Sequence, residues 1–437
     1  MSSTRLLARE LKASAGKTVT ISGWLHKKRL LGGLTFINVR DRTGLTQAVI
    51  EDKDEVEKLR GMQLGTVLKV SGKVHEDDRA PGGAELKQVK IEVIVPVVHE
   101  PPIEIDKPLS HKPDNLDTLF EHRALGLRNL QEAKIFKIRS SILRFIREYL
   151  YENEFIEINT PKIVAGAAEG GAEVFKFDYF GQEATLAQSP QLYKQIMVGV
   201  FERVFEIGPA FRAELSATTR HVSEVTMLDV EWGFIESYDD VLNLLQELVY
   251  DVLSRVYEEH SAELKSLNAP ELKLNKDFPR YSMAEIHEMY GKANKVDMSD
   301  EVDLTPDEER WICEYAKKND GCEAVFATDL PVSKMKFYHM KKDDDTALSA
   351  DLLFRGIEIS TVPQREHRLE ELIDQMKEAG VDPDSQGFAA YVSAFKHGLP
   401  PHGGFGFGID RLSEKTIGLN NVKEAILFPR DINRLSP

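Results

Sequence analysis

The feature that most limits how this chain can fold is a proline-rich stretch at residues 100–117 (EPPIEIDKPLSHKPDNLD). It contains four prolines and shows neither a helical nor a strand period. Such a stretch is typical of a linker rather than of a packed core. At 437 residues the chain is also too long for one compact core. We therefore predict an N-terminal domain at residues 1–100, a linker at 101–130 and a second domain at 131–437.

The N-terminal domain has the pattern of a small β-barrel. Apolar and polar residues alternate in five segments with turn signals between them, such as DRTG at 41–44. The segments are residues 17–25, 34–40, 45–51, 67–74 and 88–98. Among small five-stranded barrels, the oligonucleotide-binding (OB) fold is the commonest that binds nucleic acids. We expect this fold for residues 1–100.

The charge of the chain is unevenly distributed. The whole chain carries −16, whereas residues 1–100 contain 17 Lys and Arg against 13 Asp and Glu. This basic excess can attract phosphates to the N-terminal domain. The excess is modest, so charge by itself is weak support for nucleic-acid binding.

Hydropathy and cysteine content indicate a soluble protein of a reducing compartment. The chain is 42% hydrophobic and 29% charged. No apolar run approaches the length of a membrane span, and the N-terminus lacks the apolar stretch of a signal peptide. Cys313 and Cys322 are too few and too oddly spaced for a zinc site or a disulfide framework. We expect a cytoplasmic protein that does not contact membranes.

Residues 201–233 (FERVFEIGPAFRAELSATTRHVSEVTMLDVEWG) predict two strands joined by a cationic loop. An apolar run at 204–207 ends at Gly208 and Pro209, and a second strand begins near Thr226. Asp229 and Glu231 share one face of that second strand because strand side chains alternate. Cations beside carboxylates suit a polyphosphate and its metal ion. The alternative is a solvated hairpin with ordinary surface charges.

Two later segments carry further candidates for phosphate chemistry. Residues 351–360 (DLLFRGIEIS) predict a strand, a short turn and a second strand, which can bring Asp351 and Glu358 together around Mg²⁺. Residues 402–411 (HGGFGFGIDR) contain closely spaced glycines that let a strand run under a ligand. A helix beginning at Asp410 would then present Arg411 at its start.

These segments, with FRAE, TTRH and LDVE in order, resemble motifs 2 and 3 of the class II aminoacyl-tRNA synthetases. An amphipathic helix at 133–151, a strand at 155–160 and Pro161 resemble motif 1. The likeness is greatest to the archaeal-type aspartyl-tRNA synthetases of subclass IIb. It implies an α+β catalytic domain on an antiparallel sheet flanked by helices, with a helical insertion at about 236–345. It also implies a homodimer formed through motif 1.

The resemblance implies an ATP site in which positioning and charge neutralisation do the catalysis, without a covalent nucleophile. Arg212 would hold the α-phosphate and Glu214 the adenine amino group. Arg220, His221 and Arg411 would bind the outer phosphates, with Arg212 and Arg411 as the catalytic cations. Mg²⁺ would be held with ATP by Asp351 and Glu358.

The resemblance also implies an amino-acid pocket. Its residues would be Glu169, Ser189, Gln191, Lys194, Asp229 and Arg365. Lys194 and Arg365 would bind the side-chain carboxylate of L-aspartate, and Asp229 its α-ammonium. Asparaginyl enzymes usually carry Glu where this chain has Lys194. A buried ammonium favours an anion over a neutral amide, so Lys194 favours aspartate.

For the N-terminal domain, the resemblance implies an anticodon site in which Arg29, Phe36 and Gln47 grip the central uridine. The alternative is that Phe36 belongs to the core and Gln47 to the surface. His26 stands where strict archaeal relatives tend to have Trp, and RAPGG at residues 79–83 stands where they have a loop with Lys. Losing a steric wall and a donor would relax the choice between tRNA-Asp and tRNA-Asn.

The resulting hypothesis is an aspartate–tRNA ligase that charges tRNA-Asp and also tRNA-Asn. One alternative is an asparagine-forming paralogue, which would lack the domain at residues 1–100. A second is an asparaginyl-tRNA synthetase. A third, of a different class, is a non-catalytic nucleic-acid-binding protein, in which the motif residues would be expected to degenerate.

Overall fold

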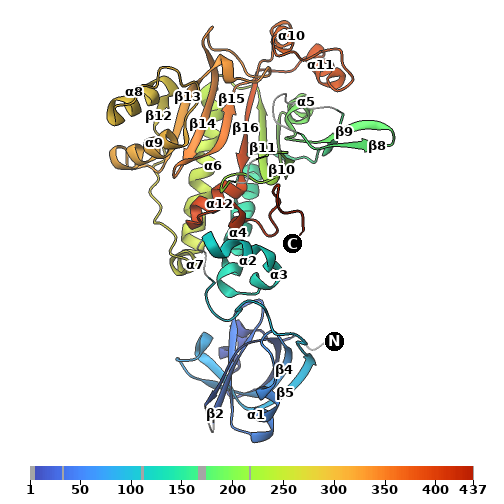
Figure 1. Ribbon diagram of the computed structural model, residues 1–437, viewed down its shortest axis with the longest axis vertical. Coiled ribbons are helices and arrows are strands. Elements are labelled where there is room, and N and C mark those ends of the chain that lie inside the picture. The colour runs from blue at the N-terminus through green and yellow to red at the C-terminus, as the bar shows by residue number, and fades with distance from the viewer. Residues whose placement is uncertain (1–4, 32–33, 110–112, 166–173, 216–217, 437) are drawn as a thin grey trace. The chain divides into compact units, whose positions relative to one another are not determined.

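The computed structural model describes residues 5–31, 34–109, 113–165, 174–215 and 218–436, and the chain divides into two compact units at residues 133/134 (Figure 1). The first unit contains a closed five-stranded barrel with the strand order β1-β2-β3-β5-β4. Its strands are β1 Thr18–Leu31, β2 Leu34–Arg40, β3 Leu45–Ile50, β4 Val67–Glu76 and β5 Ala84–Val95. Helix α1 (Lys53–Arg60) begins at an Asp52 side chain that accepts from the amides of Asp54 and Glu55. The OB-type barrel predicted from five alternating segments is confirmed.

The linker expected at 101–130 is partly helical. Residues 101–109 have no regular structure, but α2 (Pro113–Glu121) and α3 (Arg123–Gly126) follow. Leu116, Leu119 and Phe120 form a small buried cluster, and Arg123 makes a fully buried ion pair with Glu132 at 3.1 Å. The prediction relied on the proline content and missed that these apolar residues are spaced as in a helix. The irregular part of the linker is therefore shorter than expected.

The second unit is built on an eight-stranded sheet with the order β12-β13-β14-β15-β16-β11-β10-β6. The outermost pairs β12–β13 and β6–β10 are parallel and the pairs between them are antiparallel, so the sheet is mixed. The strands are β6 Ile156–Glu157, β10 Arg203–Phe211, β11 Glu224–Gly233, β12 Arg280–Ser282, β13 Ala324–Pro331, β14 Thr346–Phe354, β15 Ile357–Pro363 and β16 His402–Gly408. A separate small sheet is formed by β7 Ile163–Val164, β8 Lys176–Tyr179 and β9 Gln182–Leu186.

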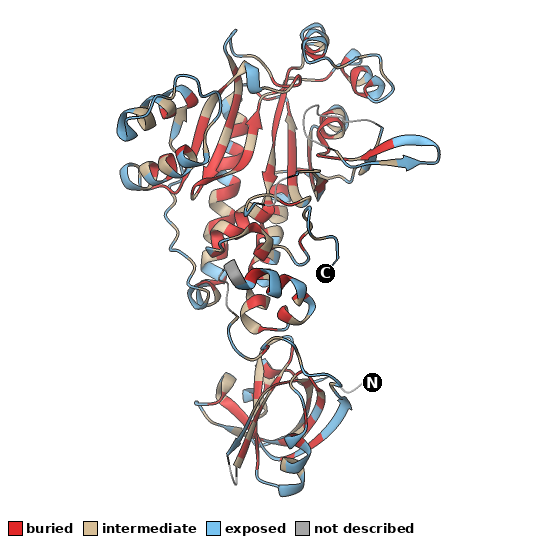
Figure 2. Ribbon diagram, viewed as in Figure 1, coloured by how far each residue is buried: buried red, intermediate tan, exposed pale blue. Residues whose placement is uncertain are grey.

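Helices cover this sheet and bury its apolar face. The main core joins the strands to α4 (Leu130–Glu152), α6 (Tyr238–Glu259) and α12 (Ile409–Ile417). A second cluster forms around α5 (Gln191–Phe201), α10 (Leu369–Glu378) and α11 (Ala389–Lys396). Figure 2 shows the central strands largely buried and the β8–β9 hairpin largely exposed.

The stretch at 236–345 is more than a helical insertion. It contains α6, α7 (Ser261–Ser266), α8 (Met283–Asn294) and α9 (Pro306–Asn319). It also contributes β12 and β13 to the central sheet, and α6 supplies ten buried residues to that unit. The resemblance implied helices in this stretch but did not predict the two strands.

Candidate active site

A cleft of about 360 Å³ lies in the second unit and gathers most of the predicted site residues. Those lining it are Ser189, Gln191, Arg212, Glu214, Arg220, His221, Asp229, Asp351, Glu358, Arg365 and Arg411. They come from strands β11, β14 and β15, helices α5 and α12 and the loop after β10, with Ser189 just before α5 and Arg365 just after β15. Lys194 lies beneath the cleft and contacts Asp229. Glu169 lies outside the described residues.

Lys194 is the centre of a buried charge cluster. Its Nζ lies 3.0 Å from Asp229 Oδ1 and 3.5 Å from Glu231 Oε2, and it donates to the carbonyl of Phe405 at 3.0 Å. Helix α5 presents Lys194 to the face of β11 that carries both carboxylates, as the alternation of that strand predicts. The ammonium is therefore held in place on three sides.

Arg365 completes the cluster from the opposite side. Its Nε lies 2.9 Å from Glu231 Oε1 and its Nη2 3.2 Å from Glu231 Oε2, which is a bidentate pair. Burial favours the neutral form of Glu231, but Arg365 and Lys194 outweigh it and lower the pKa of this carboxyl. Two cations thus face two carboxylates. Glu231 was not among the predicted site residues, although its shared face with Asp229 was evident from the sequence.

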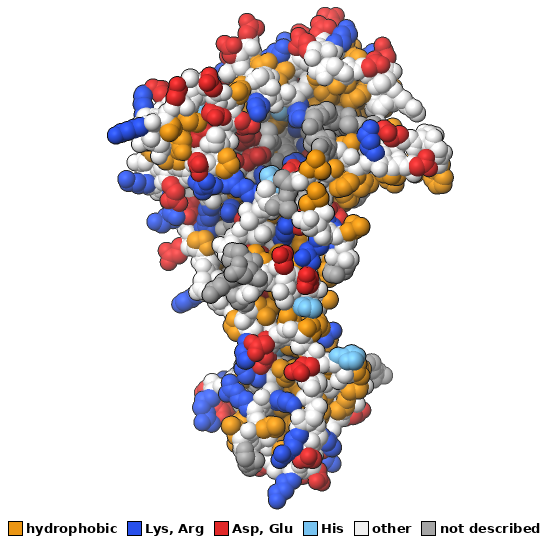
Figure 3. Space-filling model, viewed as in Figure 1, with side chains coloured by type: hydrophobic (Ala, Val, Ile, Leu, Met, Phe, Trp, Pro, Cys, Tyr) orange, Lys and Arg blue, Asp and Glu red, His pale blue; other side chains and the backbone are white. Residues whose placement is uncertain are grey.

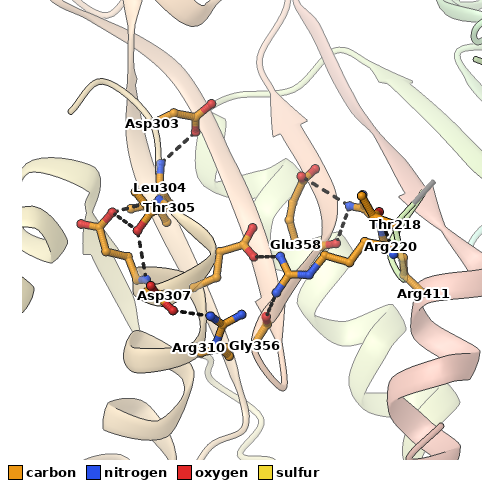
Figure 4. A network of polar contacts seen from close by, with 12 residues as sticks. Thr218, Arg220, Asp303, Leu304, Thr305, Asp307, Arg310, Gly356, Glu358 and Arg411 are labelled. Carbon is orange, nitrogen blue, oxygen red and sulfur yellow. Dashed lines mark hydrogen bonds and ion pairs between the residues drawn. The ribbon is translucent and has the colours of Figure 1, made fainter. Parts of the chain in front are cut away.

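The opposite half of the cleft holds two arginines, each paired with an acidic side chain (Figure 4). Arg220 Nη1 lies 2.5 Å from Glu309 Oε2, and its Nη2 donates to the carbonyl of Gly356 at 3.2 Å. Arg411 Nη1 lies 3.5 Å from Glu358 Oε2 and donates to the Glu358 carbonyl at 2.8 Å. Both cations can exchange these partners for the oxygens of an anionic ligand.

Asp351 and Glu358 fit a divalent cation. They lie on the antiparallel pair β14–β15, which has a register shift between Leu352 and Leu353. Asp351 Oδ1 is buried without a hydrogen-bond partner, and burial together with Glu358 raises the pKa of Asp351 well above its usual value. In the part of the chain that the structure describes, no group of three metal-ligating side chains occurs. A cation here would need oxygens from a ligand as well.

The stretch at 236–345, in which no catalytic motif was found, also reaches this cleft. Asp303, Lys334, Lys336, Tyr338 and His339 line it. These residues lie on α9's flanking loop, on the turn after β13 and on the loop before β14. No local pattern predicts these residues as part of the site, because each is brought to the cleft by the packing of segments remote in the chain.

The barrel carries a cleft of its own, of about 600 Å³, that includes Arg29, Phe36 and Gln47. Arg29 is paired with Phe36 across β1 and β2, and Gln47 lies on the neighbouring strand β3. Phe36 is half-buried, and Gln47 Nε2 donates to Glu85 Oε2 at 2.8 Å. A cation, an aromatic ring and an amide therefore meet on one surface, an arrangement suited to stacking and reading an unpaired base.

His26 lies apart from these three residues. It sits at the bulge of β1 between Leu25 and Lys27, is 6% exposed and does not line the barrel cleft. Burial, helped by Arg40, lowers the pKa of the His26 ring. Arg79 in the loop at 79–83 does line the cleft, so a cationic donor is present there after all. The loss from this loop of the donor that strict relatives carry stays a prediction.

Comparisons with known proteins match both units. The family model for the class II tRNA synthetases (D, K and N) matches residues 115–432, and that for the OB-fold nucleic acid binding domain matches residues 19–100. The chain belongs to the class II tRNA synthetases. It is therefore a ligase.

Individual relatives cover this synthetase from end to end. It is 41% identical to the aspartate–tRNA(Asp/Asn) ligase of Thermus thermophilus, over 99% of this chain and all of that protein. It is also 41% identical to the aspartate–tRNA(Asp) ligase of Pyrococcus abyssi, over 97% of each. Its structure resembles that of the asparaginyl-tRNA synthetase of Pyrococcus horikoshii in complex with asparaginyl-adenylate, with a TM-score of 0.91, 31% identity and full coverage of both chains.

Within the described residues, no helix is both long and apolar enough to span a membrane. Cys313 and Cys322 are free and buried. Burial raises the pKa of Cys313 to about 12. Neither cysteine lines the candidate active site.

Proposed function

We propose that this synthetase activates L-aspartate with ATP to aspartyl-adenylate and transfers the aspartyl group to the 3′ adenosine of tRNA. The observation that carries the proposal is the buried pairing of Lys194 with Asp229 and of Arg365 with Glu231. The α-ammonium of aspartate can replace Lys194 at Asp229. Lys194 and Arg365 then bind the side-chain carboxylate, which an uncharged amide would satisfy less well.

ATP would lie in the other half of the cleft. Arg212 would bind the α-phosphate, Arg220, His221 and Arg411 the outer phosphates, and Glu214 the adenine amino group. All five line the cleft. Asp351 and Glu358 would hold Mg²⁺, which supplies charge neutralisation to the phosphates when bound.

Catalysis then requires only that the substrates are oriented and that the charge on the phosphates is stabilised. A carboxylate oxygen of aspartate attacks the α-phosphorus in line, and pyrophosphate leaves with the electron pair of the broken P–O bond. Arg212 stabilises the charge that develops on the α-phosphate oxygens. The 3′ adenosine hydroxyl next attacks the activated carbonyl and releases AMP. Asp229 holds the ammonium throughout, so the carboxylate keeps its position.

The other candidates differ at named features. An asparagine-forming paralogue would lack the barrel, whereas the OB-fold model matches residues 19–100 here. An asparaginyl-tRNA synthetase shares the fold, as the P. horikoshii structure does. The buried ammonium of Lys194 favours the anionic side chain of aspartate over the neutral one of asparagine. The curated relatives at 41% identity are aspartate–tRNA ligases.

The test is ATP–pyrophosphate exchange and aminoacylation with labelled aspartate and asparagine, using purified tRNA-Asp and tRNA-Asn transcripts. Exchange that depends on aspartate, with charging of tRNA-Asp, is the expected result. Exchange that depends on asparagine instead, or release of free asparagine in the presence of ammonia, would contradict the proposal.

We also propose tRNA-Asn as a second substrate, with the anticodon read by Arg29, Phe36 and Gln47. The support is the cleft these residues share and the specificity named for the T. thermophilus and Methanopyrus kandleri relatives, which are 41% and 40% identical. The P. abyssi relative is named for tRNA-Asp alone. The choice therefore needs measurement on this protein.

A homodimer in the cytoplasm completes the proposal. Strand β6 ends the central sheet and pairs with β10, and its Ile156 is 43% exposed. Val200, Phe201 and Phe234 are also exposed, and the amide of Gly233 donates to the carbonyl of Glu202. Figure 3 shows hydrophobic side chains gathered at the base of the β8–β9 hairpin as well. Such a surface favours association. Light scattering that gives a monomer mass at micromolar concentration would contradict it.

A further inference from the structure

Behind the amino-acid pocket, buried side chains form a continuous chain of hydrogen bonds. Arg365 Nη2 donates to Gln191 Oε1 at 3.0 Å, and Gln191 Nε2 donates to Gln195 Oε1 at 2.9 Å. Gln195 Nε2 lies 2.9 Å from His402 Nε2. The other ring nitrogen, Nδ1 of His402, lies 2.8 Å from the carbonyl oxygen of Pro400. Gln195 and His402 are both 0% exposed.

The direction of this chain is fixed at both ends. The carbonyl of Pro400 can only accept, so Nδ1 of His402 carries the proton and Nε2 of the neutral ring is an acceptor. Burial lowers the pKa of His402 to about 4, which keeps the ring neutral at physiological pH. Gln195 must therefore turn its NH₂ group to His402 and its oxygen to Gln191. At the other end Arg365 can only donate, so it requires the oxygen of Gln191.

Tyr391 strengthens the middle of the chain. Its hydroxyl donates to Gln195 Oε1 at 3.2 Å and is 1% exposed. A glutamine amide can turn over by 180° at little cost when its surroundings allow either orientation. Here a turned Gln195 would set its NH₂ group against the NH₂ group of Gln191 and its oxygen against the acceptor Nε2 of His402. Buried donors left unpaired are costly, so only one orientation is stable.

We propose that His402, acting through Gln195, is a positioning residue that sets the orientation of the Gln191 amide beside Arg365, and thereby the affinity of the pocket for aspartate. The inference rests on the proposed function, since it takes this pocket to be the aspartate site. Gln191 lines the active-site cleft, whereas Gln195 and His402 do not. His402 therefore does not line the ligand site and acts on it only through Gln195 and Gln191.

The side chain of His402 can be tested separately from its backbone. Its carbonyl accepts from the amide of Arg365 at 2.9 Å, and this bond is unaffected by a change of side chain. The ring packs near Phe395 at 6.0 Å between centroids, and a phenylalanine ring has a similar size. His402→Phe removes the acceptor while it keeps the ring. His402→Gln places an amide oxygen near the position of Nε2.

The experiment measures KM for aspartate and KM for ATP separately in ATP–pyrophosphate exchange. For His402→Phe we expect KM for aspartate to rise about tenfold, because the chain loses a buried hydrogen bond, with KM for ATP within about twofold. His402→Gln should recover most of the loss. Gln195→Met should reproduce the effect of His402→Phe. The double variant should be no worse than either single one, because both remove the same chain.

A matched control is His260→Phe, since His260 is another buried histidine, bonded to Ser141 Oγ at 2.8 Å and outside the cleft. It should leave both KM values unchanged. Equal rises in the two KM values for His402→Phe, or additive effects in the double variant, would overturn the proposal. If the unmodified enzyme shows no aspartate-dependent exchange, the proposed function itself fails, which is a distinct result.

Discussion

The guanidinium of Arg220 lies 2.5 Å from the carboxylate of Glu309, on α9, although the two residues are 89 positions apart in the chain. Arg220 is the residue that we assign to the outer phosphates of ATP. Glu309 is largely buried, and burial raises its pKa although Arg220 opposes the shift. On the proposed assignment, the Glu309 carboxylate occupies the place that phosphate oxygens would take, and ATP would have to displace it from Arg220.

Replacing Glu309 by Gln should strengthen ATP binding. The neutral amide holds Arg220 less firmly, so KM for ATP should fall by about two- to tenfold, in the range of a partly exposed ion pair. KM for aspartate should stay the same. The measurement is ATP–pyrophosphate exchange at saturating aspartate.

The control for Glu309 comes from the same helix. Asp307 pairs with Arg310 at the protein surface, and neither residue lines the cleft. Asp307→Asn should change neither KM. A rise in KM for ATP in Glu309→Gln would show that Glu309 orients Arg220 for phosphate instead of competing with it.

Arg212 provides a test of the phosphate assignment. It is half-buried in the cleft, and its backbone amide donates to the carbonyl of Ser223 at 2.9 Å, which fixes the start of the loop. Arg212→Ala should lose adenylate formation, by about 3–4 kcal/mol of transition-state stabilisation, as for other preorganised donors. The unfolding midpoint and the molecular mass should be unchanged. Near-normal pyrophosphate exchange in this variant would remove Arg212 from the reaction.

Lys194 tests the choice of amino acid. Lys194→Leu should raise KM for aspartate far more than KM for ATP, because it removes a cation from the side-chain carboxylate and leaves Asp229 without its partner. Lys194→Met is a second variant of similar length. Parallel rises in both KM values would make Lys194 a structural residue, and the preference for aspartate would need another source.

The turn between β14 and β15 depends on an ion pair that the sequence did not reveal. Arg355 has φ of +50° in this turn, and its Nη2 lies 2.7 Å from Glu323 Oε2. Its Nη1 donates to Tyr257 and to the carbonyl of Lys415. Arg355 thereby fixes the turn that separates Asp351 from Glu358.

Breaking this pair should destabilise the second unit and expose a pH dependence. Glu323→Gln leaves Arg355 buried without its counter-charge, which costs about 3–5 kcal/mol. Burial tends to raise the pKa of Glu323, but Arg355 and Lys317 outweigh it and the pKa is lowered. The stabilisation is therefore full above the unfolded-state pKa of a glutamate and is lost as pH falls through the lower folded-state value. The measurement is the free energy of unfolding by denaturant, for the unmodified protein and for Glu323→Gln, at neutral and at acid pH. If the difference in this free energy between the two proteins does not shrink in acid, the assignment of the ion pair is contradicted.

The sequence was informative wherever a site residue belongs to a local motif. The alternation of β11 placed Asp229 and Glu231 on one face, and the strand–turn–strand pattern placed Asp351 and Glu358 on two paired strands. These relationships span a few residues, so periodicity suffices to predict them. The barrel was predictable for the same reason, whereas the large sheet was expected from the family resemblance and is mixed rather than antiparallel.

Relationships made by packing could not be predicted in this way. Glu309 reaches Arg220 only because α9 packs beside the β14–β15 turn, and Gln195 reaches His402 across 207 positions. His26 shows the limit of strand alternation, because a bulge in β1 interrupts the pattern next to it and the ring is buried. Side-chain direction after such a bulge depends on the partner strand.

The last prediction concerns the choice between tRNA-Asp and tRNA-Asn, whose anticodons differ at the third base. The barrel cleft offers Arg29, Phe36 and Gln47 for the central base, and Arg79 lies at its edge, exposed and paired with Asp77. An exposed guanidinium can donate to either C or U, whereas His26, buried at the bulge of β1, presents no steric barrier to either base. A single base mismatch is worth only about 1–3 kcal/mol even in a site that reads it directly.

We therefore expect kcat/KM for the two tRNAs to agree within a few-fold. Arg79→Ala should weaken the binding of both tRNAs to the same extent, because this residue adds affinity without discriminating between tRNA-Asp and tRNA-Asn. It should leave pyrophosphate exchange unchanged. His26→Trp should raise the ratio in favour of tRNA-Asp, because the larger ring cannot fit the buried position and must turn outward. A ratio above about a hundredfold in the unmodified enzyme, equivalent to about 2.7 kcal/mol, would reject relaxed specificity. A selective loss of tRNA-Asp charging in Arg79→Ala would instead identify Arg79 as the residue that reads the third base.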